Sequence, residues 1–492
     1  MYLLTLPPEL KLMIVDQLDP ISSFKFAISC KSHWALCKPL MERAHSCAKY
    51  QTLSFDVYSG PEGQLLWHIA KEILDDPYRG EFVQDISLPS QRHHWDENAV
   101  SYPMQPQTNL RLPPIPYNEA FSESVQQITR VIPDPPGEIS LRLCLEEAIA
   151  QGESDCPLVF LVHNAPNLNT LRVTGLEYGG LFYFYIRNTI KAFADPVWAP
   201  KLSLQHLTTV AMAHHDTEGH IPADWCRYII CIPSLRAFVA SMIGGRCDRL
   251  AGDSEAFDED EQYLWMDDDP AFQEEDDESA DEERERPRPC LPMSNVEELM
   301  FSSSALDVKR GLERILCGVT ALRRFYYDEG GALVDDEPYT PKRIINALVK
   351  HTGHSLENLV MEYAMVEDYV DMQFDFERVS LRRFKKLRTL RCDWKIVYPN
   401  NLTAEEKATF DLREILPSSL EALHLHGDFD DAEWEAIKKI LVGTRESVPN
   451  LHNIYIQRGS RRSDNVAKSE AGEKVSSEWV HRLFTYLKGQ GW

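Results

Sequence analysis

Short apolar segments with the spacing apolar-x-x-apolar-x-apolar recur along most of the chain. Their last three positions alternate with a period of two, which predicts strands with one buried face. A partial copy at Leu204 fails because Thr209 stands where an apolar residue belongs, and weaker copies lie at 53–55 and 86–88. Copies that recur at a near-constant spacing indicate a repeat architecture. The clear copies begin at Leu168, Leu235, Val296, Leu322, Leu356, Leu387, Leu420 and Leu451.

Amphipathic stretches of helical spacing separate these strands. A strand, a loop and a helix repeated with parallel strands build a curved solenoid. The strand alternation directs Leu171 and Val173 inward and Arg172 outward. The alternative is that these leucines belong to the cores of unrelated α/β domains. The predicted helices include Glu62–Leu74, Leu306–Leu316, Pro341–Lys350, Ala404–Leu416 and Asp431–Val442.

The first forty residues predict three short helices. Pro7 and Pro8 suit a first helical turn, and Asp19-Pro20 ends the first helix. The second helix is expected over 22–29 and the third over 32–43. So few residues cannot build a large core, yet they carry much apolar surface. That surface must pack on the rest of this chain or on a partner. Its members are Leu6, Leu10, Ile14, Leu18 and Trp34.

This N-terminal segment resembles the F-box over residues 3–43. The resemblance is carried by Leu6-Pro7-x-Glu9-Leu10, with Ile14 and Leu18 following at helical spacing, and by Ser29-Cys30-Lys31-x-x-Trp34. In that family the module binds a Skp-type adaptor, which links it to a cullin–RING ubiquitin ligase. Many F-boxes have Asp-Leu where this chain has Ser23-Phe24. The resemblance implies that the adaptor contacts Leu6, Pro7, Leu10, Ile14, Leu18 and Trp34.

The repeated unit resembles the leucine-rich repeats of F-box/leucine-rich-repeat proteins over about residues 50–458. Here, however, the position usually held by Asn or Cys varies, so no side-chain ladder is expected along that turn. The expected fold class is therefore α/β: a three-helix F-box followed by an irregular leucine-rich-repeat-like solenoid with parallel concave strands. The expected domains are a helical module over 1–45, the solenoid over 46–458, and a tail with a capping helix over 459–492.

Two insertions interrupt the expected solenoid. Residues 101–137 are rich in proline and contain one predicted helix, Glu119–Arg130. Residues 252–290 are acidic, and their composition predicts disorder. Alternatively, the apolar cluster around Trp265 binds a basic partner or folds back over a basic patch. The tail is polar before a final helix that carries Trp479 and Leu483.

Composition narrows the classes of function. The net charge is −26, and residues 253–286 alone hold 18 Asp or Glu. This balance argues against general nucleic-acid binding, which needs a basic surface. The sequence contains no run of about 18 apolar residues, so no membrane-spanning helix is predicted. The first residues of the chain make a poor signal peptide. The 11 cysteines include no CxxC pair and are expected to be reduced, in the cytoplasm or the nucleus.

The sequence contains no nucleotide-binding or hydrolase motif of the kinds GxxxxGK[ST], GxGxxG, HExxH or GxSxG. The one cluster with ligand-like chemistry is His214, His215 and His220, in a loop where polar residues are expected anyway. We therefore expect no catalytic residue, no metal and no cofactor. A metal protein or an enzyme centred on these histidines is an alternative that metal analysis would test.

The two resemblances together imply the substrate-recognition subunit of a Skp–cullin–F-box ubiquitin ligase, which itself performs no chemistry. A non-ligase scaffold with an F-box-like module is the alternative. Outward strand positions are the expected contacts for a protein client, since Tyr and Arg dominate interface energetics. Their mixed to basic character suggests an acidic or phosphorylated client. The expected client-binding residues are Arg172, Tyr326, Arg391, His424 and Tyr455.

Overall fold

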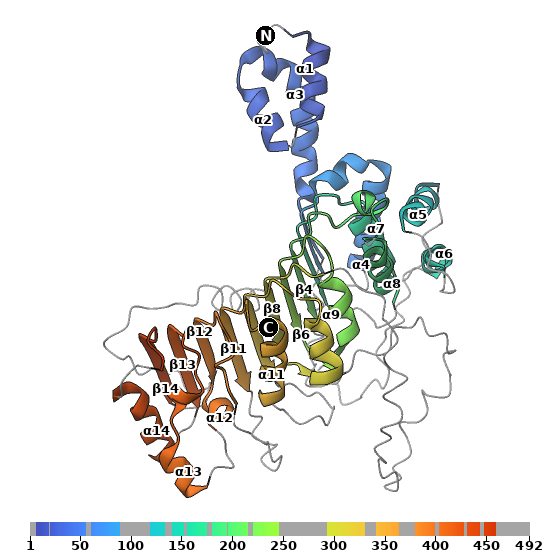
Figure 1. Cartoon of the computed structure of the whole chain (residues 1–492). Helices are drawn as coiled ribbons and strands as arrows, with labels where there is room; N and C mark the ends of the chain where they lie inside the picture. The colour runs from blue at the N-terminus through green and yellow to red at the C-terminus, as the bar shows by residue number, and fades with distance from the viewer. Residues whose placement is uncertain are drawn as a thin grey trace, which may run out of the picture.

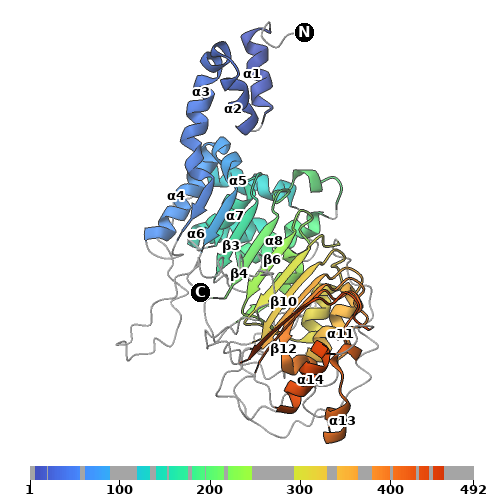
Figure 2. The same cartoon turned by 90° about the vertical axis from the view of Figure 1, so that its left-hand side faces the viewer.

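A computed structural model gives the arrangement of the chain (Figures 1 and 2). Parallel strands lie side by side in one long sheet, and three helices stand at its N-terminal end. The structure describes residues 6–18, 20–55, 61–88, 119–132, 140–151, 155–174, 180–193, 195–214, 220–245, 293–329, 341–363, 379–398, 403–427, 431–442 and 447–458.

Within the described residues the main sheet has 11 strands in the order β1-β2-β3-β4-β6-β8-β10-β11-β12-β13-β14, so strand order follows chain order. Every neighbouring pair is parallel, which confirms the predicted α/β class with a parallel sheet. A second, smaller sheet has the strand order β5-β7-β9. Its strands follow β4, β6 and β8 in the chain and pair with one another. The strands are β1 (Thr52–Ser54), β2 (Asp85–Leu88), β3 (Thr170–Thr174), β4 (Thr209–Ala213), β5 (Ile221–Pro222), β6 (Ala237–Ser241), β7 (Ile243–Gly245), β8 (Glu298–Ser302), β9 (Ala305–Leu306), β10 (Arg324–Glu329), β11 (Asn358–Tyr363), β12 (Thr389–Asp393), β13 (Ala422–Gly427) and β14 (Asn453–Arg458).

Helices follow most strands and lie along one side of the sheet. The helices α4, α7, α8, α9, α10 and α11 contact one another in that order, as a layer beside consecutive strands must. The α-helices are α1 (Pro8–Asp16), α2 (Pro20–Ile28), α3 (Lys31–Cys47), α4 (Pro61–Asp75), α5 (Glu119–Val131), α6 (Leu141–Gln151), α7 (Cys156–His163), α8 (Leu181–Phe193), α9 (Ala223–Ile229), α10 (Glu313–Leu316), α11 (Pro341–Thr352), α12 (Trp394–Val397), α13 (Ala404–Thr409) and α14 (Asp431–Val442). Shorter helical turns are η2 (Ala48–Tyr50), η3 (Pro77–Phe82), η4 (Ala199–Lys201), η7 (Val308–Leu312) and η9 (Leu412–Glu414).

One row of apolar side chains crosses the whole sheet beneath the helices. Each member pairs in register with the next, and nearly all are fully buried. A second buried row lies two residues further along each strand, as the period of two requires. The first row is Leu53, Ile86, Leu171, Val210, Phe238, Leu299, Phe325, Leu359, Leu390, Leu423 and Ile454.

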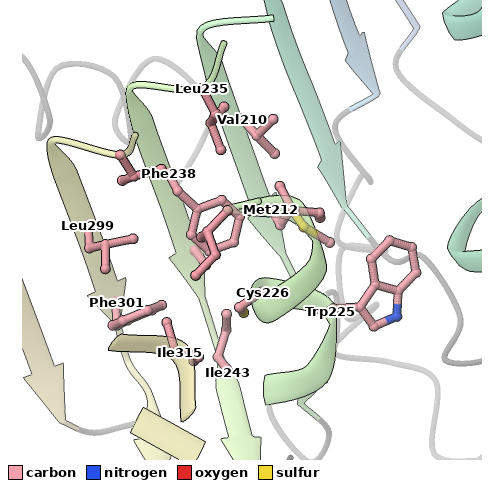
Figure 3. Close-up of a cluster of buried hydrophobic side chains, with 14 of the residues drawn as sticks. Val210, Met212, Trp225, Cys226, Leu235, Phe238, Ile243, Leu299, Phe301 and Ile315 are labelled. Carbon is pink, nitrogen blue, oxygen red and sulfur yellow. The ribbon is translucent and has the colours of Figure 1, made fainter. Parts of the chain in front are cut away.

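Figure 3 shows how this core is filled around β4, β6 and β8. Phe238 lies between the rows of the neighbouring strands, and its ring meets that of Phe301 edge to face at 6.4 Å. Trp225 and Cys226 enter from α9, which covers these strands. Aromatic side chains of this size supply much of the burial that holds sheet and helix layer together.

The register predicted for the segment at Leu204 is wrong. The copy of the repeat there is Leu207-x-x-Val210-x-Met212, because Val210 pairs with Leu171 and Met212 with Val173. Leu204 precedes the strand in a left-handed conformation, with φ of 70°, and is fully buried. Thr209 occupies an outward position, where a polar side chain is permitted.

Two predicted helices are shorter than their patterns suggested. Over 404–416 the capping box of Thr403 and Glu406 starts α13, but Phe410 takes an extended ψ of 128° and ends it. Over 306–316 the chain first adds β9 to the small sheet, and its helix begins as the wide turn η7. The helix predicted over 119–130 is present as α5, and α14 has the predicted bounds. The acidic insertion over 252–290 and the tail over 459–492 lie outside the described residues.

A ladder of alternating charge lines the turn that leads into the strands. At the residue after the first apolar position of each repeat, the backbone N–H donates to the carbonyl of its counterpart in the preceding repeat. Arg323 donates to both carboxylate oxygens of Glu357, at 3.1 and 3.0 Å, and its other side lies 3.9 Å from Glu297. These hydrogen bonds lower the pKa of the Glu357 carboxyl. The alternating positions are Arg236, Glu297, Arg323, Glu357, Arg388 and Glu421.

The charge ladder predicts that reversing one charge destabilises the fold. In Arg323→Glu three carboxylates stand in a row, and like charges on adjacent strands repel. We expect the free energy of urea unfolding to fall by about 1 kcal/mol at low salt and by less at high salt. Arg382→Glu is the matched control, since Arg382 is exposed outside the ladder. Equal losses in the two variants would contradict a role for the alternation.

Candidate functional site

The N-terminal helices form a small module with a core of its own. Among the described residues, its core is formed by the buried apolar side chains of Val15, Ala27 and Cys37, one from each helix, and Phe26 and Leu40 pack against them. The Phe26 ring stacks on His33 at 4.3 Å. This core uses the side of α1 that carries Lys11 and Val15, whereas of the predicted stripe Leu10 and Leu18 are exposed and Ile14 is half-buried.

The predicted adaptor-binding residues lie largely at the surface of the module. Leu10 is 45% exposed, Leu18 is 36% exposed and Trp34 is 41% exposed. Pro7 is also exposed, whereas Leu6 and Ile14 are half-buried. The part of the chain that the structure describes therefore leaves most of this apolar stripe in contact with solvent. Large apolar side chains gathered on a small surface mark interaction sites.

Three further apolar side chains are exposed on the same module and were not predicted as contacts. Met13 is 63% exposed, Phe24 is 50% exposed and Ile28 is 57% exposed. Met13 continues the stripe of α1, and its spacing from Leu10 was a usable signal in the sequence. Phe24 and Ile28 stand four residues apart on α2 and share one side of that helix.

The departure from the F-box pattern at Ser23-Phe24 has a clear structural role. The Ser23 side chain is buried, and its hydroxyl donates to the carbonyls of Val15 and Leu18 at 3.2 and 3.3 Å. The Val15 carbonyl lies in the last turn of α1, where it also accepts from the Leu18 N–H at 3.0 Å, and Leu18 lies just past the helix. The hydroxyl thereby ties α2 to α1 and leaves Phe24 pointing outward.

The predicted client-binding residues all lie on the open face, the side of the main sheet opposite the helices. Tyr326, Val360, Arg391, His424 and Tyr455 are consecutive partners across β10 to β14. The structure therefore brings four of the five predicted residues into one row. Arg172 lies apart on β3, several strands away, where its guanidinium donates to Asp85 at 2.5 Å.

A polar cluster that the sequence analysis missed occupies the middle of this row. Glu362 is 1% exposed, and its carboxylate accepts a hydrogen bond from the Tyr326 hydroxyl at 3.2 Å and lies 2.9 Å from Arg391 Nε. Tyr326 is itself 2% exposed and packs with Met300 and Val360. The only available signal was that Glu362 lies at an outward position, two residues beyond Val360.

The electrostatics of the open face do not favour an anionic client. Arg172 and Arg391 are each paired with a carboxylate on the same face. Burial, and then the charge of Arg391, lower the pKa of both His424 and His426 to about 4, so both rings are neutral near pH 7. The cationic character expected from the residue types alone is therefore neutralised locally.

Metal-ligating groups give no support to a metal centre in the described ranges. Within them, no group of three or more His, Cys, Asp or Glu side chains converges as a metal ion requires. His215 and residues 216–219 of the predicted histidine cluster lie outside the described residues. Among the helices that the structure describes, none is both long and apolar enough to cross a lipid bilayer.

Comparison with known proteins gives no family assignment. No protein-family model matches the chain, and no curated protein has a matching sequence. The function of the chain is therefore inferred from the geometry of the helical module and of the open face.

The buried histidines predict a loss of stability on acidification. The folded-state pKa of His426 is about 4, below the ordinary value of 6.5, so the unfolded chain binds its proton first. The contribution of the neutral His426 ring to the free energy of unfolding is intact above about pH 6.5 and is lost as the pH falls towards 4. We expect His426→Gln to reduce the fall in unfolding free energy across this window by up to about 3 kcal/mol.

Urea unfolding at several pH values measures this effect. His354→Gln is the control, because His354 is exposed on the same sheet domain. A wild-type-like pH dependence in His426→Gln would mean that this ring does not resist protonation in the folded state.

Proposed function

We propose that this chain is the substrate-recognition subunit of a Skp–cullin–F-box ubiquitin ligase. In this proposal the helical module docks a Skp-type adaptor, and the solenoid formed by the parallel repeats presents a protein client. Ubiquitin transfer belongs to other subunits, so the chain needs no catalytic residue of its own. The complex would act in the cytoplasm or the nucleus.

The exposed apolar stripe of the module carries the proposal. Leu10, Leu18 and Trp34 are each more than a third exposed on a module whose described core is the small cluster of Val15, Ala27 and Cys37. Covering the exposed part of each such side chain yields on the order of 1 kcal/mol. The same positions match the F-box pattern in the sequence, so the pattern and the exposure select the same residues.

The open face supports the second half of the proposal. A parallel sheet covered by helices on one side offers the other side as an extended surface for a partner. His424 and Tyr455 stand in one row near the β14 end, with ring centroids 5.6 Å apart. Tyr326 is buried, so a client reaches it only after local rearrangement.

A non-ligase scaffold is the second candidate. It shares the adaptor contact but excludes the cullin, and the same apolar stripe supports it equally. Co-purification separates the two functions: recovery of adaptor together with cullin supports the ligase, and recovery of adaptor alone supports the scaffold.

The adaptor contact is tested by Leu10→Asp combined with Leu18→Asp. Each change places a charge at an exposed apolar position, so the fold should survive while the contact surface is lost. We expect affinity for purified Skp-type adaptor to fall by at least about 100-fold in a direct binding titration. Partners held by the sheet should still be recovered in affinity capture.

Leu143→Asp is the matched control, since Leu143 is 62% exposed on α6, outside the module. It should bind adaptor as the wild type does. Thermal unfolding of all three proteins confirms that the folds are comparable. Wild-type adaptor affinity in the double variant would exclude this surface as the docking site.

A further inference from the structure

The helix α3 belongs to two cores at once. Its first half contributes Cys37 to the core of the helical module, whereas its last residue, Cys47, lies in the core of the sheet domain. Tyr50, directly after it in η2, is also buried in the sheet core. Figure 2 shows α3 running from the module into the rest of the chain. One helix thus connects two separately packed bodies.

Between these cores, α3 crosses residues 42–46 with little cover. Among the described residues, Arg43 is the side chain of this stretch that reaches the sheet domain. Its guanidinium donates to Asp76 at 2.8 Å and lies 4.3 Å from the centroid of the Tyr78 ring. An ion pair and a cation–π contact on one guanidinium restrict both bending and rotation of the helix about its far end.

A second set of contacts fixes the far end itself. Arg79 of η3 donates to the Tyr50 hydroxyl at 3.1 Å and lies 3.3 Å from Glu72 of α4 and 3.5 Å from Asp76. The Tyr50 hydroxyl in turn donates to Glu72. Asp76 therefore receives Arg43 from one side while Arg79 holds its position from the other.

From this arrangement we infer that Arg43 is a positioning residue, which holds the helical module at a fixed orientation to the open face. This inference rests on the proposed function only where it concerns ubiquitin transfer. The contacts of Arg43 with Asp76 and Tyr78 are a property of the free chain. With the module held, an adaptor bound to it occupies one place relative to a client on the sheet. A fixed separation raises the effective concentration of the transferring group at a limited set of lysines.

The orientation is measured in the full chain by pulsed electron paramagnetic resonance. Spin-labelled amino acids are encoded at Glu9 in α1 and Asn346 in α11, which are both exposed. We expect one narrow distance distribution in the wild type and a broadened one in Arg43→Ala. Arg43→Lys keeps a cation within reach of Asp76 and Tyr78, so it should leave the distribution narrower than in Arg43→Ala.

Lys38→Ala is the matched control. Lys38 lies on the same helix and pairs only weakly with Glu42, at 3.8 Å, within α3 itself. It should leave the distribution narrow. A distribution in Arg43→Ala as narrow as in the wild type would overturn the inference, provided that thermal unfolding shows both proteins folded.

Reconstitution with adaptor, cullin and ubiquitin carrier tests the functional consequence. Arg43→Ala should bind adaptor within about twofold of the wild type, because the docking stripe is untouched. The lysines of the variant chain that become ubiquitinated in this reaction are mapped by mass spectrometry. Ubiquitin should spread over more lysines, and the rate of ubiquitination at the preferred lysine should fall about fivefold. An unchanged pattern contradicts the positioning role, whereas failure of the wild type to bind adaptor contradicts the proposed function alone.

Discussion

Everything in this structure depends on covering the apolar rows that run beneath the helices from β1 to β14. Each repeat presents two inward apolar side chains, and neither a strand nor its helix can bury them alone. Stacking in chain order solves this problem, because Leu171 meets Val210 and Phe238 in one continuous core. The alternating ladder of Arg323 and its neighbours then favours pairing of each strand with the correct partner, since a slip by one repeat brings like charges together.

Within the described chain, the N-terminal module leaves many of its apolar side chains uncovered, unlike the main sheet. Its core is small, and six large apolar side chains of the described module are exposed, Leu10 and Leu18 among them. Helix α3 carries this surface away from the sheet, and Arg43 braces it there. The fold thus separates a closed apolar interior from an open apolar patch, and this separation supports the assignment of the patch to a partner.

Much of this architecture could be predicted from the spacing of apolar residues, since that spacing directly reflects which side chains must be buried. The parallel strands, α14 and the outward stripe of α1 all follow from it. The misplaced register at Leu204 shows where it was misapplied: Leu204 and Leu207 fit only its first two positions, whereas Leu207, Val210 and Met212 fit all three, as the strand pairing shows. The early end of α13 at Phe410 depends on tertiary packing, which local periodicity does not encode.

The candidate sites were harder to predict, because charge depends on neighbours distant in sequence. From the sequence, Arg391 is expected to be a free cation, but in the structure β11 places Glu362 beside it. Ser23 reads as a departure from the F-box pattern until its hydroxyl reaches the end of α1. The alternating charges at 236, 297, 323, 357, 388 and 421 were visible in the sequence, but their role becomes clear only when the repeats are aligned.

The central claim is that a partner covers the exposed side chains of the helical module, whereas the chain's own helices cover the apolar rows of the main sheet. Amide hydrogen exchange of the full chain with and without purified Skp-type adaptor tests it most directly. We expect slowed exchange confined to α1, α2 and the first half of α3, with β3 to β13 unchanged. Unchanged exchange in the helical module, or slowed exchange only in the sheet, would contradict docking of a partner on the module.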